Sequence, residues 1–319
     1  DSSLALCLLK QNFPENQIDA ISIKFSDSID ETETAAIIAK KVGVDHHIIE
    51  IDNFLEKLSD AISITKLPFW DIHWIYVAEN AKNFSNYLVS GDGGDELFGG
   101  YIFRYVKFMS QIDSNSSPKD KIQAYLSCHE RDHVPEQETI FDKKMQFNWK
   151  DIYDKLYPFF NNPLHPIEQV FLADYNGKLL YNFSIINNSI AKYFNLNSVT
   201  PLLSHNIIQK SMKIPLTQKL DYMSNIGKLP LRKILKKFGI EELILKQKQG
   251  FSVNTENLWK NYGFEMAKEY LSDAKIIQDG WVKEDWIKSN LNDKNIDIRH
   301  INKFFGLLAF EIWYRKFST

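Results

Sequence analysis

The residues most suggestive of chemistry stand together at positions 90–101, which read SGDGGDELFGGY. Glycines in such a run allow backbone N–H groups to approach an anion closely. Asp92, Asp95 and Glu96 stand in the same run, and their charges would repel a bare phosphate. A magnesium ion between carboxylate and phosphate oxygens removes this conflict, because this hard cation prefers oxygen ligands and pairs with nucleotides. The run therefore predicts a magnesium–nucleotide site; the alternative is a solvated turn that is merely acidic.

The elements before this run alternate between strand and helix. Short, β-branched apolar stretches predict strands at residues 18–25, 47–51 and 87–90. Helical spacing of apolar residues predicts helices at 4–10, 31–42, 53–65 and 74–83, the second ending at Gly43. This alternation predicts an α/β fold with a parallel sheet, which binds ligands at the carboxyl ends of its strands. The acidic glycine run directly follows the third strand, where such a site is expected.

The pattern of predicted secondary structure changes after residue 110. Residues 110–119 are polar and predict a linker, and the remainder is dominated by helical periodicity that ends in an aromatic-rich helix near residues 307–313. We therefore predict an α/β ATP-binding core at residues 1–110 and a mainly helical region at 111–319.

Composition excludes several classes of protein. The 319 residues include 38 Lys+Arg and 41 Asp+Glu, a formal net charge of −3, which gives no electrostatic footprint for nucleic acid. Two cysteines are too few for a disulfide framework, so a reducing, cytoplasmic location is expected. No apolar run approaches the roughly 20 residues that cross a membrane. We expect neither nucleic acid nor membrane as a partner.

The run at 90–101 resembles the signature of the asparagine synthetase family, specifically its ATP-dependent synthetase domain without the glutamine amidotransferase domain. Other stretches resemble family motifs in the same order, and they lie at residues 1–3, 22–25, 67–71, 227–232, 246–251 and 311–317. The resemblance implies a parallel sheet of the adenine-nucleotide alpha-hydrolase (PP-loop ATP pyrophosphatase) type, followed by a mainly helical region. It also implies ATP and Mg²⁺ as cofactors.

The resemblance further implies adenylation of a carboxylate, the side chain of aspartate, followed by ammonia transfer that gives asparagine, AMP and pyrophosphate. On the family pattern, Asp1 and Asp95 would coordinate Mg²⁺ on the pyrophosphate oxygens. Ser2 and Ser3 would contact the phosphates at a helix N-terminus.

The remaining site residues follow from the same resemblance. Ile23, Ser90 and Gly91 would line the adenine pocket. Asp92 would handle the incoming amine, since a nearby carboxylate can accept the proton that it sheds. Lys248 would stabilise the transition state as pyrophosphate departs.

Two departures from the family pattern affect these expectations. Because the sequence begins at Asp1, the first strand and the start of the phosphate loop are expected upstream. A glutaminase domain or subunit is also expected upstream, and without it free ammonia would be the nitrogen source. Within 186–205, which we predict to be helical, six family positions are replaced, five of them charged in the family. The replacements are Asn188, Ser189, Ala191, Asn197, Val199 and Ser204. Another carboxylate substrate, or an inactive nucleotide-binding paralogue, is therefore an alternative. A homodimer is also possible.

Other charged motifs receive plainer interpretations. His129 and His133 with Glu130 fit the spacing of a helical zinc-protease motif, but Pro135 follows closely and a third ligand is missing, so a zinc site is not expected. Lys228 and Arg232 could face phosphate, although surface or structural roles are the expectation.

Overall fold

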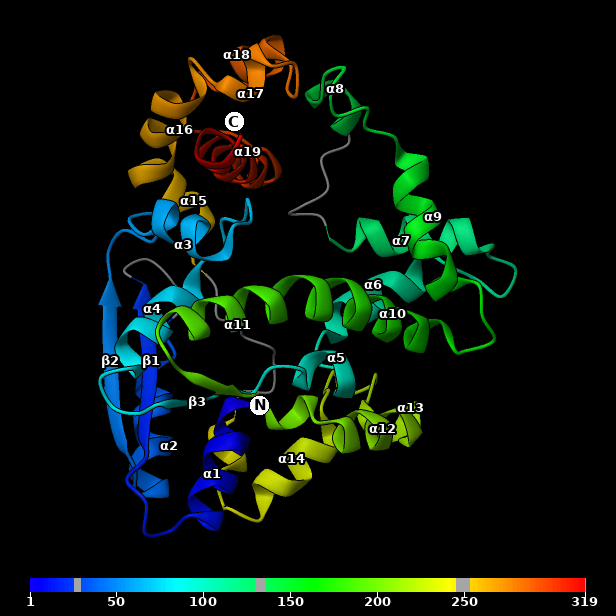
Figure 1. Ribbon diagram of the computed structural model, residues 1–319. Coiled ribbons are helices and arrows are strands. Elements are labelled where there is room, and N and C mark those ends of the chain that lie inside the picture. Colours follow the sequence, from blue (N-terminus) through cyan, green and yellow to red (C-terminus); the bar gives the residue numbers. More distant parts are fainter. Residues whose placement is uncertain (26–29, 130–135, 245–252, 319) are drawn as a thin grey trace.

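The first part of the computed structural model alternates between helices and strands (Figure 1). The structure describes residues 1–25, 30–129, 136–244 and 253–318. The first elements are α1 (Ser2–Asn12), β1 (Asp19–Phe25), α2 (Thr32–Val42), β2 (Asp45–Ile51), α3 (Leu58–Thr65), α4 (His73–Ala81) and β3 (Tyr87–Val89). Gly43 ends α2 in the left-handed conformation, at φ 75°, as its place after the apolar periodicity predicts.

The strands form two small parallel sheets. β1 pairs with β2 from Asp19 opposite Asp45 to Phe25 opposite Ile51, and β3 pairs with β4 (Asn197–Val199). The described ranges thus contain two two-stranded sheets, and the single parallel sheet that we expected is not shown. Helix α2 packs on β1 and β2, whereas α4 contacts both β1 and β3. The fold is mixed α/β and mostly helical.

Short helices follow the third strand and lead into the helical part of the chain. They are α5 (Gly94–Phe98), α6 (Ile102–Ser110), α7 (Pro118–Ser127), α8 (Gln137–Ile140) and α9 (Trp149–Phe160). The polar residues between α6 and α7 form the expected connection, and Ser117 then caps α7 with a reciprocal Ser117–Asp120 capping box.

A long helical segment crosses the middle of the molecule (Figure 1). It consists of α10 (Pro166–Asp174), the π-helix η1 (Tyr175–Phe183) and α11 (Ser184–Tyr193). We predicted a helix for residues 186–205, but this stretch also contains β4 and the 3₁₀ turn η2 (Pro201–Leu203). Pairing of β4 with β3 overrides the local helical pattern here.

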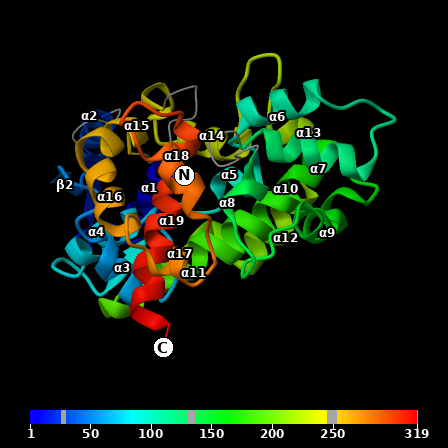
Figure 2. The same cartoon turned by 90° about the horizontal axis from the view of Figure 1, so that it is seen from above.

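The remaining helices complete the chain. They are α12 (His205–Lys213), α13 (Leu216–Lys219), α14 (Leu229–Lys236), the 3₁₀ turn η3 (Glu241–Leu243), α15 (Thr255–Leu258), the π-helix η4 (Trp259–Gly263), α16 (Phe264–Leu271), α17 (Lys275–Gln278), α18 (Glu284–Asn290) and α19 (Ile298–Phe317). The aromatic terminal helix is confirmed as α19, which runs past α16 and α17 (Figure 2).

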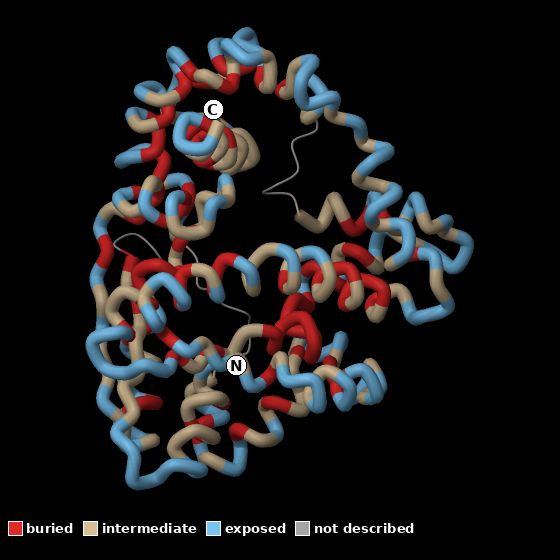
Figure 3. The backbone as a smooth tube through the Cα atoms, viewed as in Figure 1, coloured by how far each residue is buried: buried red, intermediate tan, exposed pale blue. Residues whose placement is uncertain are grey.

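The largest apolar cluster joins the sheet of β1 and β2 to the C-terminal helices. In it, Trp259 stacks on Phe304 with ring centroids 5.3 Å apart, and Phe305 is also fully buried. Buried residues are frequent along α19 and also gather around α5 (Figure 3). The division at residue 110 stays a prediction, since this core includes residues from both sides of it. Within the described ranges, no helix is long and apolar enough to cross a membrane.

Candidate active site

The glycine run leaves β3 and turns against the start of α1. A Cβ added at Gly91 would lie 2.5 Å from the backbone nitrogen of Ser2, and one at Gly94 would overlap the carboxyl group of Asp1. Real Cβ atoms do not approach other atoms so closely, so only glycine lets these backbones meet. The structure thus brings Asp1, Ser2 and Gly91 together, while the roles predicted for them stay predictions.

Asp95 enters the same place from α5. Gly93 starts this short helix with φ 91° and Gly99 ends it with φ 79°. The run is therefore a loop only up to Gly93, and it continues as a helix that is buried along its whole length. This helix holds the Asp95 side chain close to Asp1, since Lys228 contacts both carboxylates.

Lys228 is the residue that the sequence reasoning underrated. Its Nζ lies 2.8 Å from Oδ1 of Asp95 and also donates a hydrogen bond to Oδ2 of Asp1. The three side chains are only 18%, 11% and 16% exposed, respectively, so this contact lies inside the molecule. The expectation of a surface position is wrong for Lys228, because the turn before α14 places it between the two carboxylates proposed to bind metal; the structural role that we also expected is not contradicted.

The donor set suits a hard divalent cation. Two carboxylates already gather around one positive charge, and Mg²⁺ is typically held by one or two carboxylates together with substrate phosphates and waters. A metal cage made of protein alone is not found, since the described ranges contain no group of three or more His, Cys, Asp or Glu side chains that could hold an ion. Metal ligation by Asp1 and Asp95 stays a prediction.

Asp92 lies beside this pair in its own set of contacts. Its Oδ2 accepts hydrogen bonds from the Ser90 hydroxyl at 3.0 Å and from the Asn187 amide at 3.2 Å. His73 is also near: its Nδ1 is 2.8 Å from Oδ1 of Asp71. Burial alone would lower the pKa of His73, but the charges of Asp71 and Asp92 outweigh burial and raise it. The two acids therefore favour a protonated imidazole beside Asp92.

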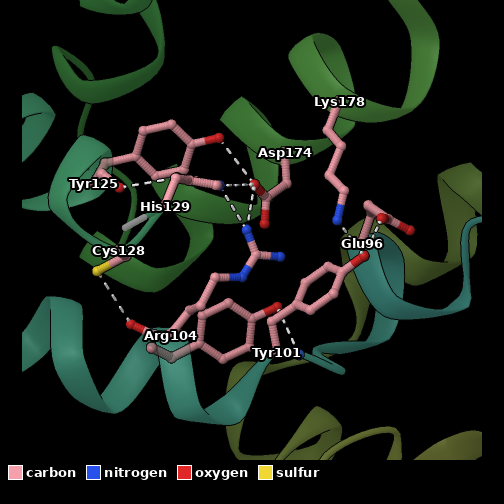
Figure 4. A network of polar contacts seen from close by, with 9 residues as sticks. Glu96, Tyr101, Arg104, Tyr125, Cys128, His129, Asp174 and Lys178 are labelled. Atoms are coloured by element: carbon pink, nitrogen blue, oxygen red, sulfur yellow. Dashed lines mark hydrogen bonds and ion pairs between the residues drawn. The ribbon is translucent and has the colours of Figure 1, made fainter. Parts of the chain in front are cut away.

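A buried network of polar side chains supports the site from α6, α7 and α10 (Figure 4). Arg104 donates to Nε2 of His129 at 2.7 Å and to Oδ1 of Asp174 at 3.4 Å. Tyr125 donates its hydroxyl to the same Asp174 oxygen at 2.9 Å. Burial and the Arg104 charge lower the pKa of His129, so the imidazole is neutral and can accept from the guanidinium. Sequence reasoning missed this network.

Tyr101 links the network to α5. The Arg104 guanidinium lies 3.6 Å from the Tyr101 ring centroid, and the Tyr101 hydroxyl donates to Glu96 at 2.7 Å. Lys178, from η1, donates to the same hydroxyl at 2.9 Å. Burial and the nearby Asp95 carboxylate raise the pKa of Glu96. The network therefore fixes the helix that carries Asp95 through its neighbour, Glu96.

The other predicted residues have separate outcomes. Ser3 lies in the first turn of α1, beside the cluster, and Ile23 lies within β1 as part of the core. Their ATP-binding roles stay predictions. Lys248 and the family-like stretch 246–251 lie outside the described residues.

The structure gives no support for a zinc site at the His129–His133 motif. Glu130 and His133 lie outside the described residues, and both ring nitrogens of His129 are engaged, Nε2 by Arg104 and Nδ1 by the carbonyl of Tyr125 at 3.1 Å. The lone pair that a zinc ion would require is therefore taken.

Comparison with known proteins decides the family. The model of the asparagine synthase family matches residues 1–315, nearly the whole chain. The chain belongs to the asparagine synthase family.

Individual relatives in this asparagine synthase family are distant. The chain is 22% identical over 349 aligned residues to asparagine synthetase [glutamine-hydrolyzing] 1 of Bacillus subtilis. This alignment covers 98% of the chain and 54% of the Bacillus protein. It is 33% identical over 107 residues to putative asparagine synthetase [glutamine-hydrolyzing] 2 of Methanocaldococcus jannaschii, with 32% of the chain and 21% of that protein covered. The chain therefore spans about half the length of the Bacillus relative.

Proposed function

We propose that this chain is the ATP-dependent synthetase unit of an amide-forming ligase that makes asparagine. A carboxylate oxygen of the aspartate side chain attacks the α-phosphorus of ATP, and the bond to pyrophosphate breaks. Ammonia then attacks the acyl carbon, the bond to AMP breaks, and the nitrogen loses a proton. The observation that carries this proposal is the pairing of Asp1 and Asp95 around a positive charge, beside glycine backbone that can approach phosphate.

Each site residue has a physical task in this reaction. Mg²⁺ held by Asp1 and Asp95 would neutralise charge that develops on pyrophosphate. Ser2 and Ser3 open an eleven-residue helix whose N-terminal N–H groups favour phosphate. The adenine would lie against Ile23, Ser90 and Gly91, and Lys248 would stabilise the charge on the departing pyrophosphate.

Asp92 is proposed to accept the proton from the attacking amine. Both hydrogen bonds that the described residues donate to its carboxylate reach Oδ2, from Ser90 and Asn187. These bonds fix the orientation of the carboxylate. Oδ1 is then the oxygen proposed to take up the proton.

A second candidate is the same chemistry on a different carboxylate. Asn188 and Ser189 replace the charged family positions, and in the structure Asn188 is exposed while the Ser189 hydroxyl donates back to the Ile185 carbonyl at 2.8 Å. A helix face without these charges lacks the groups that would pair with the charges of aspartate. Pyrophosphate release measured across a panel of carboxylates separates this candidate from the first.

The decisive assay is pyrophosphate release by the full-length chain with ATP, Mg²⁺, ammonium and aspartate. Asp95→Asn should reduce the rate about 100-fold or more, the scale expected when a group that stabilises developing charge is removed. Asp60→Asn, an exposed acid on α3, is the matched control and should leave the rate unchanged. Equal rates for the Asp95 variant and the wild type would refute the metal assignment.

The nitrogen source and the assembly state belong to the same proposal. Both relatives are named glutamine-hydrolyzing, and we propose that a glutaminase domain or subunit delivers ammonia to this unit. Glutamine would then replace ammonium in the assay once that partner is present. A homodimer stays a prediction, to be checked by sedimentation.

A further inference from the structure

Lys228 is held at the acid pair by its backbone as well as by its charge. Its N–H donates to the carbonyl of Phe98 at 3.1 Å, at the end of α5. A Cβ on the preceding Gly227 would overlap the carbonyl oxygen of Gly99, so the two backbones are in direct contact. The turn that presents the ammonium is therefore fastened to the glycine run.

The conformation of Lys228 is itself unusual. Its φ is 58°, in the left-handed region that favours glycine, and a lysine keeps such a strained conformation only where the surrounding structure enforces it. Its stem passes Gly100, where an added Cβ would lie 2.5 Å from Cε of Lys228. Both the strained backbone and the missing side chain at Gly100 let the ammonium reach Asp1 and Asp95.

A positive charge is needed at this point whenever metal is absent. Asp1 and Asp95 are two carboxylates at one site with little solvent, and like charges so placed repel each other. The ammonium of Lys228 contacts both and offsets that repulsion. It also takes up the carboxylate oxygens that a divalent cation would use.

We propose that Lys228 is the internal counter-ion of the metal site, holding Asp1 and Asp95 together before a divalent cation binds and releasing them when it does. This inference rests on the proposed function in one respect, the assignment of Asp1 and Asp95 as metal ligands. A metal ion that binds without nucleotide must displace the ammonium of Lys228, whose backbone is held at the glycine run. Nucleotide phosphates supply oxygens that can pair with the displaced ammonium, so metal and nucleotide enter together.

The test measures Mn²⁺ binding to the nucleotide-free, full-length chain by the paramagnetic resonance of free Mn²⁺. Lys228→Met removes the competing charge and should tighten Mn²⁺ binding about tenfold or more, where tenfold corresponds to about 1.4 kcal/mol. Lys228→Arg keeps the charge and should bind Mn²⁺ as the wild type does. Lys233→Met changes an exposed lysine on α14, the helix that follows Lys228; it is the matched control and should leave Mn²⁺ binding unchanged.

Thermal unfolding supplies a second readout. In the presence of a chelator, Lys228→Met should unfold at a lower temperature than the wild type, because two carboxylates are left facing each other. Added Mn²⁺ should restore most of this loss, and it should shift the wild type much less. The proposal is overturned if Lys228→Met binds Mn²⁺ within twofold of the wild type or more weakly. It is also overturned if Mn²⁺ does not change the unfolding temperature of Lys228→Met.

These outcomes are separable from those of the proposed function. Tight Mn²⁺ binding by Lys228→Met, in a chain that releases no pyrophosphate with any carboxylate, supports the counter-ion and refutes the ligase. If pyrophosphate release requires Asp95 while Mn²⁺ binding by Lys228→Met is unchanged, the ligase is supported and the counter-ion is refuted.

Discussion

Replacing Gly227 with alanine should separate the Lys228 turn from the glycine run. The new Cβ would overlap the carbonyl oxygen of Gly99 and lie 3.0 Å from its carbonyl carbon. Ordinary contact begins near 3.4 Å, and the clashing atoms are backbone, so no side-chain rotation relieves the overlap. The two segments must move apart by roughly 1 Å, which also stretches the 3.1 Å hydrogen bond from Lys228 to Phe98.

The expected cost follows from these two losses. Overpacking costs about 1–3 kcal/mol and the lost hydrogen bond about 1 kcal/mol, so the free energy of unfolding should fall by about 2–4 kcal/mol. Urea unfolding measures this quantity, with the slope compared to confirm that the unfolded states match. Mn²⁺ binding without nucleotide should tighten as well, because the ammonium that competes with the metal moves away from Asp1 and Asp95.

A matched glycine gives the opposite sign. Gly306 lies within α19 and has nothing within 4 Å of an added Cβ. Gly306→Ala should therefore stabilise the protein by about 1 kcal/mol, the helix-propensity difference between the two residues. If the free energy of unfolding of Gly227→Ala lies within about 0.5 kcal/mol of the wild type, the packing argument is refuted, because substitutions at the protein surface have effects of that size.

Two further predictions concern the buried network. Asp174→Asn leaves the Arg104 guanidinium without its buried anion and should cost about 3–5 kcal/mol in urea unfolding, whereas Asp154→Asn, from an exposed pair, should cost under about 1 kcal/mol; similar values would contradict the assignment. Glu96 has a raised pKa, chiefly from burial, so the native state holds its proton more tightly than the unfolded chain does. The contribution of Glu96 to the stability of the folded state is therefore fully present below its ordinary pKa of 4.5, and it is lost as the pH rises through the pKa of the folded state. Glu96→Gln should gain stability relative to the wild type as pH rises toward neutrality, and a pH-independent difference would contradict this.

Local signals in the sequence were sufficient for several elements. The apolar spacing before Gly43 predicts α2 and its end, and the aromatic periodicity near the C-terminus predicts α19. The prediction of a helix from residue 53 was too long, because α3 begins at Leu58. The Asn53 side chain accepts the N–H of Leu55 at 3.0 Å, which stabilises a turn in place of the first helical residues.

Long-range contacts explain what sequence reasoning missed in the site. Asp1 and Asp95 are recognisable from the motifs around them, but Lys228 is far from both along the chain and adopts a backbone conformation that its residue type disfavours. Gly227 before it and Pro230 after it signalled a turn into a helix, without indicating what the turn faces. The pairing of Arg104 with Asp174 carries no local signal, since charged residues in helices are mostly exposed.

The π-helix η1 sets the angular register of the long helical segment. Lys178 and Asn187 are nine residues apart, which is about two and a half turns of a regular α-helix and would place them on opposite sides. Both nevertheless reach the glycine run and its continuation, Lys178 at Tyr101 and Asn187 at Asp92. The wider turns of η1 advance the chain by a smaller angle per residue than a regular α-helix does, and this reduces the angle between the two side chains. Shortening this stretch by one residue would rotate everything after it by about 100° and swing Asn187 out of reach of Asp92.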